Sequence, residues 1–183
     1  MHFVLMGVSG SGKTTVAEYI SQQLEFPFAE ADLLHPTANI KKMEAGTPLT
    51  DEDRWPWLQE LAAWIAAHEA LGESTVMACS SLRRSYRDML RKGAPDVLFL
   101  HMHGPSEVIW ERIDAREDHF MPSTLLKSQL ATLEPLGVDE KGREFDVRLD
   151  LKTLQEQVLK YVRGRLRTQE RVESEGTPQG PVE

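Results

Sequence analysis

Short apolar runs alternate along the chain with longer segments in which apolar residues recur every three or four positions. The short runs predict five strands, at residues 3–6, 27–31, 74–79, 97–102 and 145–149. Helical spacing predicts helices over residues 13–24, 51–71, 82–92, 105–117, 123–133 and 151–166, with a short one around 40–43. This alternation predicts a three-layer α/β fold, in which helices cover both faces of a doubly wound, five-stranded parallel sheet.

The first predicted strand leads directly into a glycine-rich loop that matches the pattern G-x-x-x-x-G-K-[ST]. Glycines let the backbone turn sharply, so that successive amides converge on a phosphate. Lys13 is expected to reach the β- and γ-phosphates of a nucleotide, and Thr14 to ligate Mg²⁺. The predicted ATP-binding residues are Gly7, Val8, Ser9, Gly10, Ser11, Gly12, Lys13, Thr14 and Thr15. The alternative is a turn of the same composition that binds no ligand.

Length and charge narrow the classes of protein. The 183 residues fit one domain, predicted over 1–167 with a lid at about 112–134, followed by a disordered tail at 168–183. The single cysteine, Cys79, excludes an intramolecular disulfide. No leader or long apolar run is visible, so we expect a cytoplasmic protein without a membrane segment. The net charge of −8 argues against nucleic acid as a partner and leaves small anions as ligands.

Polar residues follow the second predicted strand, at the edge of the sheet where α/β proteins bind ligands. Asp32 is a candidate to accept the proton of an attacking hydroxyl, or to act on Mg²⁺ through water, and the alternative is a turn or helix cap. His35 is a candidate substrate contact or a surface-loop imidazole. Arg54 either contacts substrate or pairs with Asp51 or Asp53 on a solvated face. Their grouping favours a site.

Three arginines, Arg83, Arg84 and Arg87, lie at the start of the helix that Ser80 and Ser81 are expected to cap. A guanidinium group matches carboxylate and phosphate oxygens through paired hydrogen bonds, so this group is a candidate for anion recognition, with Arg83 the predicted substrate contact. The alternative is a solvated, charged helix face.

A break at residues 118–122 separates two helical segments and predicts a lid over the site. Arg112, Arg116 and His119 fall at this break. A cation that closes over a transferring phosphoryl group would stabilise its charge and exclude water, which makes Arg116 a candidate catalytic residue. The alternative is exposed pairing with neighbouring acidic residues.

Several sequence blocks carry a resemblance that runs from about Met1 to Leu166. After the glycine-rich loop they are Asp32-Leu-Leu-His-Pro36, Gly46-Thr-Pro-Leu-Thr-Asp51, Asp53-Arg-Trp-Pro-Trp-Leu58, Cys79-Ser-Ser-Leu-Arg-Arg-Ser-Tyr-Arg-Asp88, His119-Phe and Leu126-Lys-Ser-Gln-Leu-Ala-Thr-Leu-Glu134. In these blocks the chain resembles the small bacterial-type gluconokinases, P-loop kinases of the nucleoside-monophosphate and shikimate kinase-like group. It departs from the common family pattern at Ala31, Trp55, Ser81 and Arg83.

The resemblance implies a P-loop kinase fold with a helical lid and ATP-dependent phosphorylation of D-gluconate to 6-phospho-D-gluconate with Mg²⁺. It also implies a homodimer. By the same resemblance, Asp32, His35 and Arg54 face the sugar acid, Arg112 flanks the adenine, and Arg116 and His119 belong to the lid.

Other functions stay open at this stage. Within kinases, shikimate or another small hydroxylated acid is the next substrate, although a shikimate-type Gly-Gly-Gly stretch is missing. A nucleotide-binding scaffold without catalysis would keep the same motifs. A GTPase switch is disfavoured, because the string Asp139-Glu-Lys-Gly142 follows a loop and no N-K-x-D string exists.

Overall fold

The computed structural model describes residues 1–114 and 123–175 of the chain, without the side chains at 123–125, 173 and 175. Its centre is one five-stranded sheet in the order β2-β3-β1-β4-β5, with every strand parallel to its neighbours. The strands are β1 (His2–Met6), β2 (Phe28–Glu30), β3 (Thr75–Ala78), β4 (Val97–His103) and β5 (Gly142–Asp146). The predicted fold class, a doubly wound parallel sheet, is confirmed.

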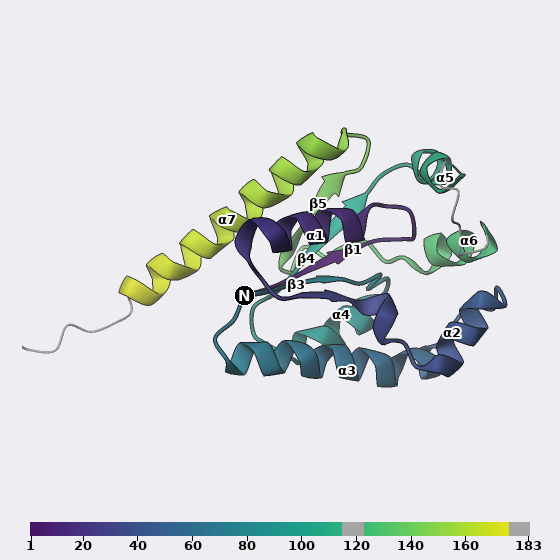
Figure 1. Ribbon diagram of the computed structural model, residues 1–183, viewed down its shortest axis with the longest axis horizontal. Coiled ribbons are helices and arrows are strands. Elements are labelled where there is room, and N and C mark those ends of the chain that lie inside the picture. Colours follow the sequence, from purple (N-terminus) through teal and green to yellow (C-terminus); the bar gives the residue numbers. More distant parts are fainter. Residues whose placement is uncertain (115–122, 176–183) are drawn as a thin grey trace, which may run out of the picture.

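Helices cover both faces of this sheet (Figure 1). Helices α1 (Lys13–Leu24) and α7 (Leu151–Glu175) lie on one face, and α3 (Asp51–Ala70) and α4 (Arg84–Arg91) lie on the other. Strand β1 shows why two cores form, because successive side chains point to opposite faces. Phe3 and Leu5 join the core beneath α1 and α7, whereas Val4 and Met6 join the core above α3 and α4.

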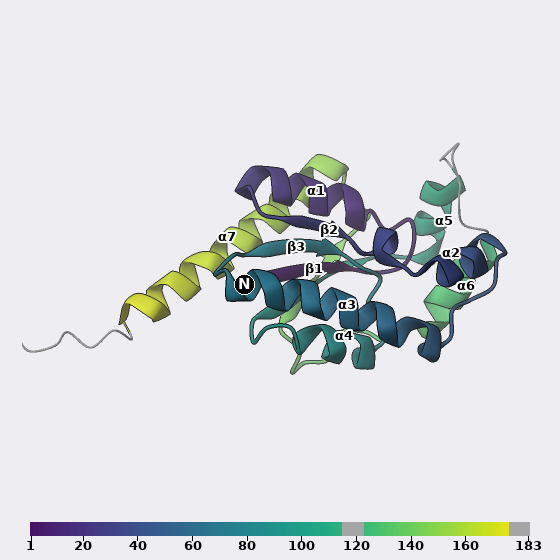
Figure 2. The same cartoon turned by 60° about the horizontal axis from the view of Figure 1, so that its bottom comes forward.

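The remaining elements gather at the carboxyl ends of the strands. These are the 3₁₀ turn η1 (Ala31–Leu34) and the helices α2 (Thr37–Glu44), α5 (Ser106–Asp114) and α6 (Ser123–Thr132). Both ribbon views place α2, α5 and α6 at this one end of the molecule (Figure 2). The fold therefore concentrates its irregular elements at the edge where ligands bind in such sheets.

The fifth strand lies earlier in the chain than predicted. The alternation of Phe145, Val147 and Leu149 predicted a strand over 145–149, but β5 begins at Gly142 and ends at Asp146. A Cβ at position 142 would meet the Phe99 carbonyl oxygen at 2.2 Å, so this close pairing requires glycine. At the other end, Asp146 accepts the Arg148 amide and turns the chain away from the sheet.

The fourth helix also starts later than predicted. The two serines were expected to cap it, but Arg83 is the N-cap residue and Arg84 the first helical residue of α4. Ser81 is buried and adopts a left-handed backbone conformation with φ of 44°. This turn leads the chain from β3 into α4, so Ser81 shapes a loop instead of capping a helix.

Helix α7 continues through Glu175, although its segment from Thr168 was predicted to be disordered. That prediction rested on the scarcity of apolar residues, and Val172 is indeed 66% exposed. The packed part of α7 already supplies the costly helix nucleus, and the Gln, Glu and Arg residues that follow propagate it well. Local helix propensity therefore carries α7 beyond the core. No helix among the described residues is long and apolar enough to span a membrane.

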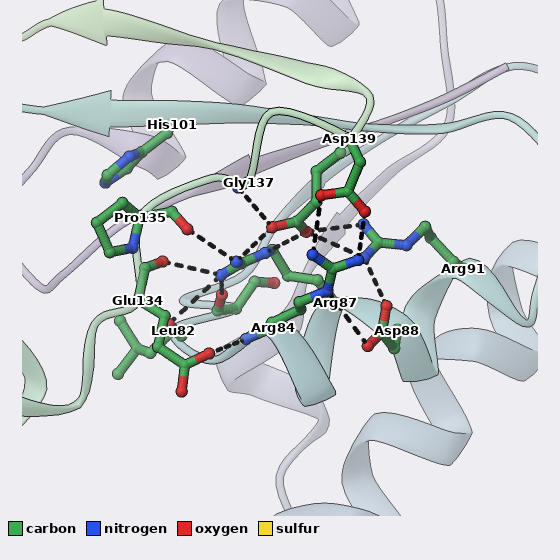
Figure 3. Close-up of polar contacts among 12 residues, drawn as sticks. Leu82, Arg84, Arg87, Asp88, Arg91, His101, Glu134, Pro135, Gly137 and Asp139 are labelled. Atoms are coloured by element: carbon green, nitrogen blue, oxygen red, sulfur yellow. Dashed lines mark hydrogen bonds and ion pairs between the residues drawn. The ribbon is translucent and has the colours of Figure 1, made fainter.

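A buried ion cluster joins α4 to the segment between α6 and β5 (Figure 3). The Arg87 guanidinium is fully buried and donates to both Glu140 carboxylate oxygens at 2.7 Å. It also donates to the carbonyls of Glu134 and Pro135. Burial alone would raise the pKa of Glu140, but hydrogen bonds from Arg87, the Gly137 amide and Arg91 hold it at about 2. Both charges are thus compensated inside the protein.

The cluster shows what Arg84, Arg87 and the string Asp139-Glu-Lys-Gly142 contact in the folded protein. Arg84 pairs with Asp139 at 2.5 Å, and Arg87 pairs with Glu140. These two arginines therefore bind the segment that follows α6. In the string from Asp139 to Gly142, the acidic residues form ion pairs and Gly142 begins β5.

Candidate active site

The glycine-rich loop runs from the end of β1 to the start of α1. Gly12 is the N-cap of α1 with φ of 89°, and no side chain caps the helix there. The first amides of α1 and its positive dipole end are therefore directed into the loop. Gly10 has φ of +78°, and a Cβ there would meet Ile113 of α5 at 2.4 Å. Glycine is required at this position both by its backbone conformation and by its packing.

The side chains of Lys13 and Thr14 lie next to the loop, where a phosphate group and a metal ion would bind. The Lys13 ammonium donates to the Val8 carbonyl at 2.9 Å, so its side chain folds back over the loop. The Thr14 hydroxyl donates to the Glu30 carboxylate at 2.7 Å. Because this bond uses the single hydroxyl hydrogen, the oxygen lone pairs of Thr14 are left to face a cation.

Glu30 is a site residue that the sequence analysis missed. It ends β2, two residues before Asp32, and its carboxylate also accepts the Asp32 amide at 3.5 Å. Burial raises the pKa of Glu30, while the Thr14 hydrogen bond lowers it. A polar residue at the carboxyl end of a predicted strand was the available signal for its role.

A tryptophan of α3 holds Asp32 and His35 in place. The Trp57 indole nitrogen donates to the Ala31 carbonyl at 2.8 Å, which fixes the turn η1 that carries Asp32. The Trp57 ring also stacks on the His35 ring with 3.9 Å between centroids. The buried face of one helix thus positions two polar residues that follow β2.

His35 is buried, and its ring nitrogen lies 3.4 Å from the Asn39 amide nitrogen. Burial lowers the pKa of His35 to about 4, with the Arg54 charge acting in the same direction and Asp32 opposing it. The ring is therefore neutral at physiological pH. A neutral imidazole offers one donor and one acceptor, which suits recognition of hydroxyl groups.

The Arg54 guanidinium is positively charged, and only some of its N–H groups donate hydrogen bonds to described residues. One terminal nitrogen donates to the Leu49 carbonyl at 3.4 Å, and the guanidinium lies 5.5 Å from the centre of the Tyr86 ring. Its buried Nε has no hydrogen-bond partner among the described residues. Asp51 and Asp53, the acids considered as partners, bond instead to Arg83 and Lys42. Arg54 is therefore equipped to bind an anion.

Residues of the loop, with Asp32, His35 and Arg54, line one cavity of about 430 Å³ at the carboxyl edge of the sheet, while Glu30 and Trp57 contact its lining residues. Its lining consists of Ser9, Gly10, Gly12, Lys13, Thr14, Thr15, Asp32, His35, Met43, Pro48, Leu49, Arg54, Ser80, Ser128 and Gln129. The cavity brings the glycine-rich loop together with the three polar residues that follow β2 in the chain. One end of the cavity, at the loop, is therefore suited to phosphate, and the other end, at Asp32, His35 and Arg54, is suited to a polar anion.

Helix α6 contributes a residue that the sequence analysis did not single out. The Gln129 carboxamide oxygen accepts the Ser9 backbone amide at 2.7 Å. Gln129 and its neighbour Ser128 lie in the block 126–134, which was noted for its resemblance but given no role. The spacing of that block pointed to an amphipathic helix and carried no indication of what the helix covers.

Among the described residues, the predicted contacts Arg83 and Arg112 do not line the cavity, and neither do Gly7, Val8 and Ser11 of the loop. Arg83 is directed to Asp51, with 2.9 Å between nitrogen and oxygen. Arg112 donates to the Val147 carbonyl, and its guanidinium lies within 3.9 Å of the position that a Cβ at Gly12 would take. Arg112 thus stays beside the loop, outside the cavity. Arg116 and His119 lie outside the described residues.

The oxygen donors near Thr14 fit a magnesium ion. Mg²⁺ prefers hydroxyl, carboxylate and water ligands and retains several waters. Thr14 offers lone pairs, and the carboxylates of Glu30 and Asp32 lie within two residues of each other at the end of β2. This donor set suits direct ligation by Thr14 and contacts through water from the carboxylates.

Comparison with known proteins agrees with the fold and the site. The family model described as AAA domain matches residues 3–136. The structure of a sugar kinase from Janibacter sp. is 53% identical, covers 88% of this chain and 93% of that one, and superposes with a TM-score of 0.85. A shikimate kinase structure from Aquifex aeolicus, 16% identical with a TM-score of 0.60, shares the fold alone. The chain is a P-loop kinase.

Relatives define the family within this class. A gluconokinase of Gluconobacter oxydans is 48% identical over 75% of this chain and 77% of its own length. The thermosensitive gluconokinase of Escherichia coli is 45% identical over 85% of this chain and 83% of its own length. A gluconokinase structure from Sinorhizobium meliloti is 42% identical, covers 96% of this chain and 97% of that one, and has a TM-score of 0.83. The chain belongs to the gluconokinase family.

Proposed function

We propose that the chain transfers the γ-phosphoryl group of ATP to the terminal hydroxyl of D-gluconate, releasing ADP and 6-phospho-D-gluconate. Membership of the gluconokinase family supports this reaction. The observation that carries the proposal is the shared cavity, because Lys13, Asp32 and Arg54 all line it. A nucleotide phosphate and a sugar acid bound there would meet between the loop and η1.

The glycine-rich loop holds the phosphates in this proposal. Backbone amides and the start of α1 bind the β- and γ-phosphates, and Lys13 neutralises the charge that develops during transfer. Mg²⁺ bound at Thr14, with Glu30 and Asp32 contacting its waters, would supply further charge stabilisation at the transferring group. The hydrogen bond from Thr14 to Glu30 orients the threonine lone pairs for this role.

Arg54 binds the carboxylate of gluconate in this proposal. Its guanidinium is partly buried, and its Nε lacks a partner among the described residues. Neutral His35 then contacts the hydroxyl groups of the sugar acid. Recognition of a carboxylate at one end of an extended acid leaves its far hydroxyl to approach the γ-phosphate.

Asp32 acts on that hydroxyl. Its carboxylate lines the cavity from the turn η1, which Trp57 fixes. As the hydroxyl oxygen bonds to the γ-phosphorus, the bond from that phosphorus to the oxygen of the leaving ADP breaks, and Asp32 accepts the hydroxyl proton. Catalysis then depends mainly on positioning and on charge stabilisation.

The direct test is release of ADP from MgATP with D-gluconate, shikimate, glycerate, AMP or water as acceptor. Strong stimulation by D-gluconate alone is the expected result. Stimulation by another acid would overturn the substrate while keeping the phosphoryl transfer, and ATP binding without turnover on any acceptor would indicate a non-catalytic scaffold.

Two further features stay predictions, a homodimer from the family resemblance and a cytoplasmic location from the sequence. The chain is expected to work as a homodimer in the cytoplasm. Light scattering of the purified protein tests the oligomeric state, and fractionation of the producing cells tests the location.

A further inference from the structure

Two neighbouring strands bring two histidines and a glutamate together on one face of the sheet. In the pairing of β4 with β5, His101 lies opposite Glu144 and His103 lies opposite Asp146. Residues two apart on a strand share a face, so His101, His103 and Glu144 point the same way. Phe99 shares that face and packs into the core beside α3 and α4, which places the three residues on the α4 side of the sheet.

The three side chains already lie close together. The His101 Nδ1 atom and the Glu144 carboxylate are 3.2 Å apart, and the two imidazole centroids are 5.2 Å apart. One ligand atom from each of the three residues falls within 4.8 Å of the others. His101 is 2% exposed, whereas half of the Glu144 side chain is open to solvent. The group is therefore buried on the His101 side and accessible to an ion from solvent on the Glu144 side.

Two imidazoles and one carboxylate are the ligand set typical of zinc and similar borderline ions. Zinc–nitrogen bonds of about 2.1 Å place neighbouring tetrahedral ligands about 3.4 Å apart. His103 and Glu144 are exposed, so their side chains can rotate and bring the present separations towards this value. We propose that His101, His103 and Glu144 form a binding site for one divalent transition-metal ion of the zinc class, with water completing its coordination.

The arginines beside this group are paired with carboxylates. Asp146 follows Glu144 on the same face and pairs with Arg148 at 2.6 Å. The nearest buried cation, Arg87, is neutralised by Glu140, so no uncompensated positive charge from this cluster faces the histidines (Figure 3). A metal ion here would replace the hydrogen bond between His101 and Glu144 with two stronger bonds.

The proposed site lies directly behind the nucleotide loop and is distinct from the magnesium position. A Cβ at Gly7 would come within 3.6 Å of the His101 ring, so this imidazole packs against the first residue of the loop. Thr14 and Glu30 belong to the other end of the loop and to β2, and they offer oxygen ligands alone. Nitrogen ligands distinguish the two sites, because Mg²⁺ binds imidazole poorly.

The test is a zinc titration of untagged, nucleotide-free protein against a chromophoric chelator, in an excess of Mg²⁺. One equivalent of Zn²⁺ is expected to bind, and Co²⁺ is expected to give visible absorption bands of a nitrogen-ligated site. His103→Ala and Glu144→Gln should each weaken Zn²⁺ binding about tenfold or more and remove the cobalt bands. Thermal unfolding should shift upward with Zn²⁺ in the unchanged protein alone.

A matched control separates this site from adventitious binding by surface histidines. His68 also contacts a carboxylate, that of Glu73 at 2.5 Å, and His68→Ala is expected to leave zinc affinity unchanged. His103 and Glu144 are exposed, so their variants are expected to fold, and circular dichroism checks this. Absence of Zn²⁺ binding, or equal binding by the two variants and the unchanged protein, overturns the proposal. Because the readout needs no gluconate or ATP, its failure is independent of the proposed reaction.

Discussion

The backbone amide of Ser9 donates to the Gln129 carboxamide oxygen at 2.7 Å, which joins the nucleotide loop to helix α6. The two residues are 120 positions apart in the sequence, and both line the cavity. An amide of this loop is a donor that a phosphate oxygen also uses. Gln129 therefore lies beside the position that a phosphate oxygen would take in the loop.

The first prediction concerns this contact. Gln129→Ala is expected to lower kcat about tenfold, because one hydrogen bond of about 1.4 kcal/mol corresponds to that factor. Steady-state kinetics with D-gluconate and MgATP measure it. The control is Lys127→Ala on the same helix, whose side chain is exposed. A kcat within twofold of the unchanged protein would remove Gln129 from the reaction.

Asp32→Asn should lower kcat by about 10² or more, because the amide cannot accept the hydroxyl proton. Binding of MgATP, measured by calorimetry, should change little, since the loop residues that hold the phosphates are untouched. Turnover close to that of the unchanged protein would exclude Asp32 as the proton acceptor and would leave it a role in binding.

Glu30→Gln should raise the Mg²⁺ concentration needed for half-maximal activity about tenfold, as expected for a residue that orients a metal ligand. The substitution keeps the shape of the side chain and removes its charge beside Thr14. The measurement is initial rate against free Mg²⁺ at a fixed ATP concentration. Glu44→Gln on α2 is the control, because Glu44 is exposed; identical magnesium dependence in both variants would contradict the assignment.

Acid should destabilise the protein partly through His35. Its pKa in the folded protein, about 4, lies below the ordinary value of 6.5. The neutral buried ring therefore stabilises the fold above pH 6.5, and this contribution is lost as the pH falls from 6.5 towards 4. Urea unfolding at several pH values should show a smaller decrease over this range for His35→Phe, which keeps an aromatic ring against Trp57. An equal decrease for both proteins would show that the imidazole does not titrate in this way.

Removing Arg87 should be strongly destabilising. Arg87→Ala leaves the buried Glu140 carboxylate without its main partner, which typically costs about 3–5 kcal/mol of unfolding free energy. Arg87→Met combined with Glu140→Leu should recover part of this loss, since no uncompensated charge is then buried. Arg84→Ala, which removes an exposed pair with Asp139, should have little effect. Urea unfolding of the four proteins measures the differences, and equal losses for Arg87→Ala and Arg84→Ala would refute the role of burial.

Much of the fold could be predicted because its elements are locally encoded. The helix over 13–24 follows from apolar spacing behind the glycine-rich loop, and α3 begins at a local capping box between Thr50 and Asp53. The boundaries of β5 and α4 could not be predicted in this way. Gly142 pairs with β4 through its backbone, and Ser81 turns the chain in a left-handed conformation, so neither leaves an apolar pattern.

Tertiary structure separated arginines that look alike in sequence. Arg54 faces the cavity, Arg83 pairs with Asp51, and Arg87 is buried against Glu140. A helical face alone does not say which carboxylate lies opposite each guanidinium, because the partners come from distant segments of the chain. Charge pairing across the fold decided these roles.

By itself, the sequence determined the parallel α/β class, the phosphate loop at residues 7–14 and the neighbourhood of Asp32, since each depends on local spacing or on residue type at the end of a strand. Only the tertiary structure decided that Glu30 bonds to Thr14, that Gln129 reaches Ser9, and that His101 and Glu144 share a face. These contacts join segments that are far apart in the chain. Strand order and register set them, and no local pattern of residues records either one.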